Sequence, residues 1–145
     1  MRRRTFEVLI VDDELNICNA LQRILRQEGY LVKAVLDGNT ALDVISKNRT
    51  DVVLLDMMMP GVNGREICCM ARHIAADIKV IYFTAFAGSS WTSLRDLEGE
   101  ADGFIRKPAS AKKILAELNS VLNTPVRNGL NKNVPKTLQL ARSVG

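Results

Sequence analysis

The chain has little of the residue types that mark several protein classes. It contains one histidine, three cysteines and only 5% aromatic residues among 145. Cys18, Cys68 and Cys69 do not form a C-x-x-C pair, so we expect small buried side chains and no metal or redox site. No apolar run approaches the ~18 residues of a membrane span, and the residues after Met1 lack the form of a signal peptide. These absences favour a globular protein of the cytoplasm, without a membrane partner.

Excess charge is also absent from most of the chain. The net charge is +4, but residues 124–145 carry four basic residues and no acid, which leaves 16 basic and 16 acidic residues in 1–123. We therefore expect one domain over 1–123 without a basic face, and nucleic acid only as a ligand of some further domain. Residues 124–145, interrupted by Pro and Gly, are expected to form a basic linker or tail. That tail either leads to an output domain or ends a stand-alone protein.

Short apolar runs alternate with amphipathic segments along the rest of the chain. We expect strands at five runs of Val, Ile and Leu, at 6–11, 30–36, 51–56, 79–84 and 103–106. Helical spacing of apolar residues predicts helices over 14–28, 40–47, 65–76 and 110–122, and a thin stripe of Trp91, Leu94 and Leu97 predicts another. Such alternation predicts an α/β fold, a doubly wound five-stranded parallel sheet with helices on both faces.

Polar side chains stand where four of these strands end. Asp12 and Asp13 follow the first strand, Asp56 the third, Thr84 ends the fourth and Lys107 follows the fifth. Because the carboxyl ends of parallel strands share one edge of the sheet, we expect all five to converge there. Three close carboxylates repel each other unless a hard cation such as Mg²⁺ joins them. With a lysine and a hydroxyl beside it, the arrangement predicts phosphoryl transfer to an aspartate.

The same residues resemble the receiver domain of response regulators in two-component signalling. The likeness covers residues 6–123 and rests on one ordered set: Asp12-Asp13, Asp56, Pro60-Gly61, Gly64, Thr84-Ala85 and Lys107-Pro108. It implies the flavodoxin-like strand order 2-1-3-4-5. It also implies a phosphorylation-controlled switch, not an enzyme, whose Asp56 accepts a phosphoryl group from a histidine kinase, a histidine phosphotransfer protein or a small phosphodonor.

By this resemblance, Asp13 and Asp56 would ligate Mg²⁺ together with the backbone carbonyl of Met58, and Mn²⁺ would be able to substitute. Asp12 would act mainly through water.

The resemblance also implies roles around the phosphoryl group. Lys107, held by a cis Lys107–Pro108 peptide, would pair with the phosphoryl oxygens, and Thr84 would move to hydrogen-bond them. The small Ala85 would leave the group room. Phe104 would turn inward with Thr84 and change the surface formed by the fourth helix, fifth strand and fifth helix, which also allows a homodimer.

Two positions depart from the usual pattern of that family. Met58 and Phe86, each two residues beyond a key site residue, are apolar where many relatives are polar. These positions help to control access of the hydrolytic water, so we hypothesise a long-lived phosphoryl group. Phe104 lacks the hydroxyl of the common tyrosine.

Two other functions stay open at this stage. A receiver-like interaction module that is not phosphorylated is the first, although the intact acids, Thr84 and Lys107 disfavour it. An aspartyl-phosphate phosphatase of the haloacid-dehalogenase type is a more distant one, because the chain has Met58 where such enzymes place a general acid. A dinucleotide-binding enzyme is disfavoured because no G-x-G-x-x-G follows the first strand. The cognate kinase, the output and the oligomeric state are not encoded in any recognisable motif.

Overall fold

The computed structural model describes residues 4–61, 63–85 and 100–125. Strands and helices alternate through these ranges: β1 (Glu7–Val11), α1 (Leu15–Gln27), β2 (Leu31–Val35), α2 (Gly38–Lys47), β3 (Val52–Leu55), α3 (Gly64–Ile74), β4 (Lys79–Thr84), β5 (Gly103–Arg106) and α5 (Ala111–Leu122). The elements predicted in these ranges are all present, with bounds that agree within two residues. The predicted helix with Trp91, Leu94 and Leu97 lies outside the described residues, as does Phe86.

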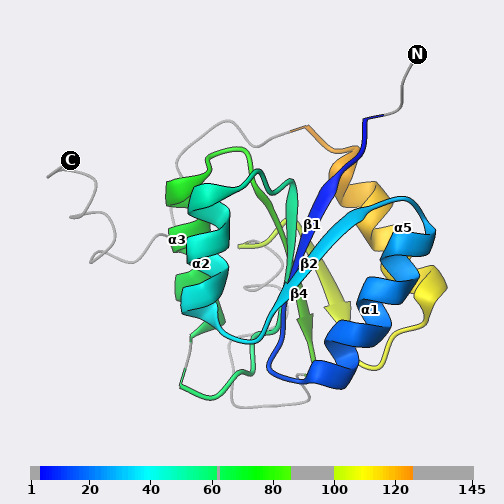
Figure 1. Ribbon diagram of the computed structural model, residues 1–145, viewed down its shortest axis with the longest axis horizontal. Coiled ribbons are helices and arrows are strands. Elements are labelled where there is room, and N and C mark those ends of the chain that lie inside the picture. The colour runs from blue at the N-terminus through cyan, green and yellow to red at the C-terminus, as the bar shows by residue number, and fades with distance from the viewer. Residues whose placement is uncertain (1–3, 62, 86–99, 126–145) are drawn as a thin grey trace, which may run out of the picture.

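The five strands form one parallel sheet of order β2-β1-β3-β4-β5, which confirms the predicted fold class and order (Figure 1). β1 pairs with both β2 and β3, so the chain reverses its direction of winding at β1. In sheets of this kind, ligands bind beyond the carboxyl ends of the strands at that reversal. Asp12 and Asp56 follow the two strands that meet there.

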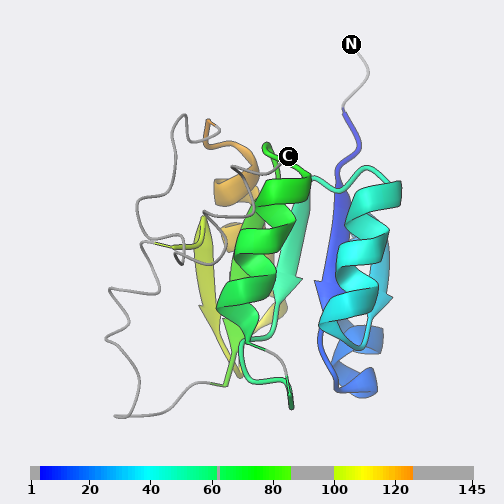
Figure 2. The same cartoon turned by 90° about the vertical axis from the view of Figure 1, so that its left-hand side faces the viewer.

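Helices cover both faces of the sheet and create two cores. Alternate side chains of β1 face opposite ways, so Leu9 and Val11 pack under α2 and α3, whereas Val8 and Ile10 pack under α1 and α5. Figure 2 shows α2 and α3 side by side on their face of the sheet. All four residues of β3 and all six of β4 are buried, as expected of strands covered on both faces. The residues just past these strands are therefore attached to the most rigid part of the molecule.

Side-chain caps define where three of the helices begin. Ser110 accepts a hydrogen bond from the Lys113 N–H and so begins α5, as its position in the sequence predicts. Asp37 and Asn63 cap α2 and α3 in the same way. Within the described ranges, no helix is both long and apolar enough to cross a membrane.

Candidate functional site

Backbone hydrogen bonds carry the sheet ladder one residue past the strands that bear the site. The Asp56 N–H donates to the Val11 carbonyl at 2.9 Å, and the Lys107 N–H donates to the Thr84 carbonyl at 2.8 Å. Asp12 is held likewise, through its N–H to the Val35 carbonyl at 3.2 Å. The backbones of Asp12, Asp56, Thr84 and Lys107 are thus fixed by the sheet itself.

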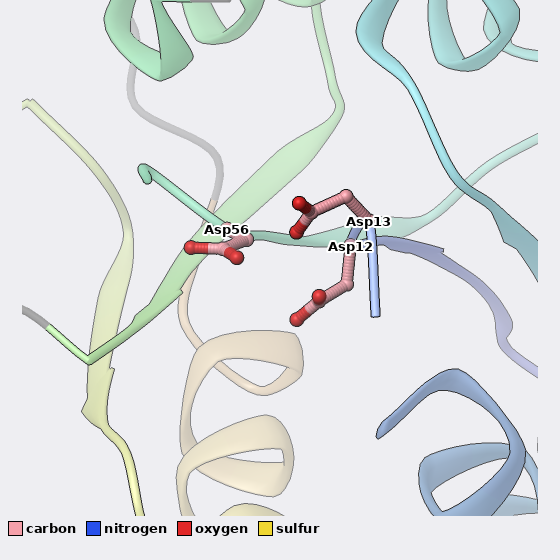
Figure 3. A group of neighbouring side chains, drawn as sticks. All are labelled: Asp12, Asp13 and Asp56. Atoms are coloured by element: carbon pink, nitrogen blue, oxygen red, sulfur yellow. The ribbon is translucent and has the colours of Figure 1, made fainter. Parts of the chain in front are cut away.

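Three carboxylates converge at this edge of the sheet. Asp12, Asp13 and Asp56 each place an oxygen within 4.8 Å of the others, and Figure 3 shows the three side chains facing a common space. Oxygen ligands of Mg²⁺ lie ~2.1 Å from the ion, so opposite ligands are ~4.2 Å apart. The carboxylates therefore fit a small divalent cation after little movement.

Asp12 and Asp56 are held in the same manner. Both are buried, with 1% and 5% of the residue exposed. In each, Oδ1 accepts the N–H of the residue two positions later, from Glu14 to Asp12 and from Met58 to Asp56, both at 2.9 Å. In each, Oδ2 faces the Lys107 Nζ, at 2.6 Å for Asp12 and 3.4 Å for Asp56. One lysine thus partly neutralises two buried acids.

Lys107 reaches this position from the end of β5. The Lys107–Pro108 peptide is cis, the isomer that the resemblance implies. Nζ also lies 5.0 Å from the centroid of the Phe83 ring, a cation–π contact. Burial alone would lower the pKa of Lys107, but the hydrogen bond to Asp12 and the charges of Asp56 and Asp12 outweigh it and raise the pKa above its ordinary value. The ammonium is therefore a permanent charge at the site.

The Asp13 carboxylate is more available to a cation than the Asp12 carboxylate. Its side chain is exposed and makes no ion pair with any residue in the described ranges. Both oxygens of Asp12, in contrast, already have partners, Glu14 and Lys107. The adjacent acids are thus unequal, and Asp13 is the more available direct ligand.

Thr84 carries a buried hydroxyl that lacks a partner. The residue is 0% exposed, and its Oγ1 has no hydrogen-bond partner among the described residues. A buried hydroxyl left unpaired costs about 1–3 kcal/mol, so this atom can gain free energy from an acceptor that arrives later. The next residue, Ala85, is small and exposed, which leaves space beside it.

Phe104 and Met58 occupy the surroundings of the site. Phe104 pairs in register with the fully buried Tyr82 of β4, and it is itself half-buried against the core under α2 and α3. Met58 lies two residues after Asp56, to which its N–H donates, and it is 49% exposed, so it borders the approach to Asp56.

Comparison with known proteins decides the family. Residues 8–119 match the sequence model of the response regulator receiver domain. The chain belongs to this family. Among curated relatives, this receiver domain is 36% identical over 115 residues to the response regulator MprA of Mycobacterium sp. (strain KMS), a match that covers 79% of the chain and 50% of the relative. The chain thus spans about half the length of that two-component regulator.

Solved receiver structures share the fold. A CheY-like response regulator receiver domain protein from Methanospirillum hungatei JF-1 is 28% identical, with a TM-score of 0.75 over 83% of this chain and 95% of that one. The response regulator TrrA of Thermotoga maritima, solved in complex with Mg(2+)-BeF, is 30% identical, with a TM-score of 0.70 over 81% and 99% of the two chains.

The structure also reveals a charged network between α3 and the segment before β5 that sequence reasoning missed. From α3, Arg65 Nε donates to Glu100 Oε2 at 2.7 Å and Arg72 Nη2 donates to Asp102 Oδ2 at 2.9 Å. Asp102 Oδ2 also accepts the Val80 N–H at 2.8 Å. The partners stand about thirty residues apart in the chain, so local spacing offered no signal for them. They tie α3 to the segment that leads into β5.

Proposed function

We propose that this receiver domain is a phosphorylation-controlled switch in which Asp56 is the phosphoacceptor. One observation carries the proposal: the buried Asp56 carboxylate belongs to a cluster of three acids, faces a fixed lysine and shares its edge of the sheet with the buried Thr84 hydroxyl, which has no partner among the described residues. This is the chemistry that phosphoryl transfer to a carboxylate requires, namely a positioned nucleophile and neutralisation of the transferred charge. Family membership supports the same function.

Asp13, Asp56 and the backbone carbonyl of Met58 would hold Mg²⁺, with Mn²⁺ as a substitute. The exposed carboxylate of Asp13 supports a direct contact, and the oxygens of Asp12, which already contact Glu14 and Lys107, support a contact through water. When bound, the cation would neutralise charge on the phosphoryl oxygens and lower the repulsion among the three acids.

In the transfer step, one Asp56 oxygen attacks phosphorus of a phosphohistidine. The new O–P bond forms as the P–N bond breaks, and the electron pair leaves with the imidazole nitrogen, which takes a proton. Lys107 exchanges part of its contact with Asp12 and Asp56 for a contact with a phosphoryl oxygen, so its positive charge neutralises the transferred group. The unpartnered Thr84 hydroxyl donates to another phosphoryl oxygen, which gives the phosphorylated state a bond that the resting state lacks.

Movement of Thr84 is the step that would reach Phe104. Thr84 ends β4 and Phe104 lies on the neighbouring β5, with its ring half-buried. We propose that Phe104 turns further inward when Thr84 is drawn to the phosphate. That rotation would alter the surface of the fourth helix, β5 and α5, the surface proposed for readout and for homodimer contacts.

The likeness to longer response regulators supports the wider arrangement. We propose a receiver domain over 1–123 and a linker over 124–145 that leads to an output domain. Its phosphodonor would be a histidine kinase or a histidine phosphotransfer protein in the cytoplasm, and the domain would act as a signalling component with no substrate of its own to turn over.

The decisive experiment is phosphorylation with a small donor. We expect incubation with Mg²⁺ and acetyl phosphate or phosphoramidate to add the mass of one phosphate to the intact chain, and Asp56→Asn to abolish that gain. Asp51→Asn is a matched control, because Asp51 stands at the other end of β3 and pairs with Arg4 and Arg49. Equal labelling of the natural chain and Asp56→Asn would defeat the assignment of Asp56. Failure of Mg²⁺ with beryllofluoride to bind would instead favour an unphosphorylated interaction module.

A further inference from the structure

A hollow of about 370 Å³ lies beside β2, toward the end of the sheet opposite Asp56. Its walls come from the first half of β1, the end of α1 with the turn and the first half of β2 that follow it, and the end of α2 with the residues that follow it. Small-molecule sites commonly measure ~300–1,000 Å³. The hollow is therefore large enough for a ligand and is separate from the phosphorylation site.

The hollow exists because the helices leave the start of β2 uncovered. β2 is an edge strand that pairs with β1 alone, and α1 and α2 flank it on opposite faces of the sheet (Figure 1). Leu31 remains 55% exposed and Lys33 is exposed as well. An apolar side chain that stays half in water stabilises a complex when a ligand covers it.

The backbone at this edge disfavours an added peptide strand. The Leu31 N–H donates to Phe6 and the Val35 carbonyl accepts from Asp12, so alternate residues of β2 bond to β1 and Val32 points its backbone outward. Arg26 Nη2 already donates to the Val32 carbonyl at 3.0 Å. Because a new strand would have to displace that bond, a small molecule fits the hollow better than a peptide does.

The lining carries an excess of positive charge. Arg26 lies on α1, Lys33 on β2 and Arg49 in the segment after α2, and Glu7 is the one acid among the described residues of the lining. Asp51 lies near Arg49 at 3.2 Å, but the same carboxylate also pairs with Arg4 at 2.7 Å. Lys33 has no ion pair with any residue in the described ranges. This local excess attracts an anion although residues 1–123 are neutral overall.

We propose that this hollow binds a small amphipathic anion, a molecule with an apolar body and one carboxylate, sulfonate or phosphate group. The apolar body would lie against Leu31 and Val44, which line the hollow. The anionic group would meet Lys33, with Arg49 beside it. This binding does not involve Asp56, so it stands independently of the phosphorylation proposal.

The probe is 8-anilinonaphthalene-1-sulfonate, an aromatic body that carries a sulfonate. We expect saturable binding by fluorescence, with ¹⁵N–¹H shift changes that concentrate at Leu31 to Lys33, Val44 and Thr50. Lys33→Glu is expected to weaken the affinity by about tenfold or more, because a charge-assisted contact is replaced by repulsion. The uncharged relative N-phenyl-1-naphthylamine is expected to bind more weakly to the natural chain, and Lys33→Glu to leave its affinity unchanged.

Two matched controls make the result specific. Lys112→Glu changes the same charge on an exposed position of α5, and it is expected to bind the probe as the natural chain does. Asp56→Asn is also expected to bind it normally. The proposal is overturned by affinity weaker than ~1 mM, by shift changes centred elsewhere, or by equal effects of Lys33→Glu and Lys112→Glu.

Discussion

Replacement of the Thr84 hydroxyl by a methyl group should stabilise the resting protein. The side chain is fully buried and Oγ1 has no partner among the described residues, so the hydroxyl has lost its water without a replacement. In Thr84→Val that penalty disappears, and valine suits a strand at least as well as threonine does. Most core substitutions destabilise a protein, so a gain here would be diagnostic.

The expected size follows from the cost of an unpaired hydroxyl. Since that cost is about 1–3 kcal/mol, we expect the free energy of unfolding to rise by about 1–2 kcal/mol. For a folded unit of this size, each kcal/mol raises Tm by roughly 4 °C.

The same variant should respond less to a phosphoryl analogue. A ligand at 100 times its Kd stabilises a protein by about 2.7 kcal/mol. Loss of a charge-assisted hydrogen bond to the analogue weakens binding by about tenfold to a hundredfold, so Mg²⁺ with beryllofluoride should stabilise Thr84→Val by only about 0.4–1.4 kcal/mol. The variant is thus expected to be the more stable protein without the analogue, and its advantage over the natural chain is expected to fall by about 1.3–2.3 kcal/mol when the analogue is present.

Urea unfolding followed by circular dichroism, with and without Mg²⁺ and beryllofluoride, measures both effects. Thr84→Ser is the control, because it keeps the hydroxyl and the response to the analogue but loses a buried methyl group, at a cost of about 1 kcal/mol. If Thr84→Val is less stable than the natural chain without the analogue, the hydroxyl is bonded in the resting state and the reasoning fails.

Three further predictions concern other parts of the molecule. Met58→Asn is expected to shorten the lifetime of the phosphoryl group by about tenfold or more, because a polar side chain at this exposed position can orient the attacking water. Intact mass, followed over time, measures the loss of phosphate, and an unchanged rate would contradict the prediction. Arg72→Met is expected to lower the free energy of unfolding by about 3 kcal/mol, because the mostly buried Asp102 carboxylate loses its ion-pair partner. Lys47→Met, at an exposed ion pair, is expected to cost under about 0.5 kcal/mol. Urea unfolding compares the two variants, and similar losses would refute the difference. Burial raises the pKa of the Cys68 thiol from 9.0 to about 11. The contribution of this group to stability is therefore complete below pH 9 and falls by about 1.4 kcal/mol per pH unit as the pH rises toward the folded pKa. Denaturant unfolding from pH 8 to 10.5 should show a shallower decline of stability for Cys68→Ala than for the natural chain, and equal slopes would count against this prediction.

The strand ends of the site were predictable from local pattern because each one follows a buried run. Asp12 and Asp56 come directly after runs of Val, Ile and Leu, and a parallel sheet must bring such ends to one edge. The pattern could not distinguish Asp12 from Asp13, because both follow the same strand. In the structure, Lys107 and a backbone N–H engage Asp12 and leave Asp13 exposed.

Charges that pair across the fold were not predictable. Lys79 looked like the polar start of a strand, yet it is buried and its Nζ donates to the Val121 carbonyl at 3.0 Å, near the end of α5. On α3, Arg65 and Arg72 pair with acids that follow much later in the chain. Hydrophobic spacing shows which face of an element is covered, but it carries no information on which distant charge completes a buried pair.

The site residues differ in whether their side chains already have partners, and this difference indicates which contact with a phosphoryl group would drive the switch. Asp56 and Lys107 have backbone N–H groups tied into the sheet, and their side chains already have partners. In the proposed transfer, a phosphoryl group would therefore meet a nucleophile and a cation that need little rearrangement. Thr84 is different, because its backbone carbonyl is held by Lys107 while its buried hydroxyl has no partner among the described residues. Since a ligand shifts a conformational equilibrium only through contacts that differ between the two states, we infer that the contact of this hydroxyl with phosphate is the main source of the free energy that drives the switch.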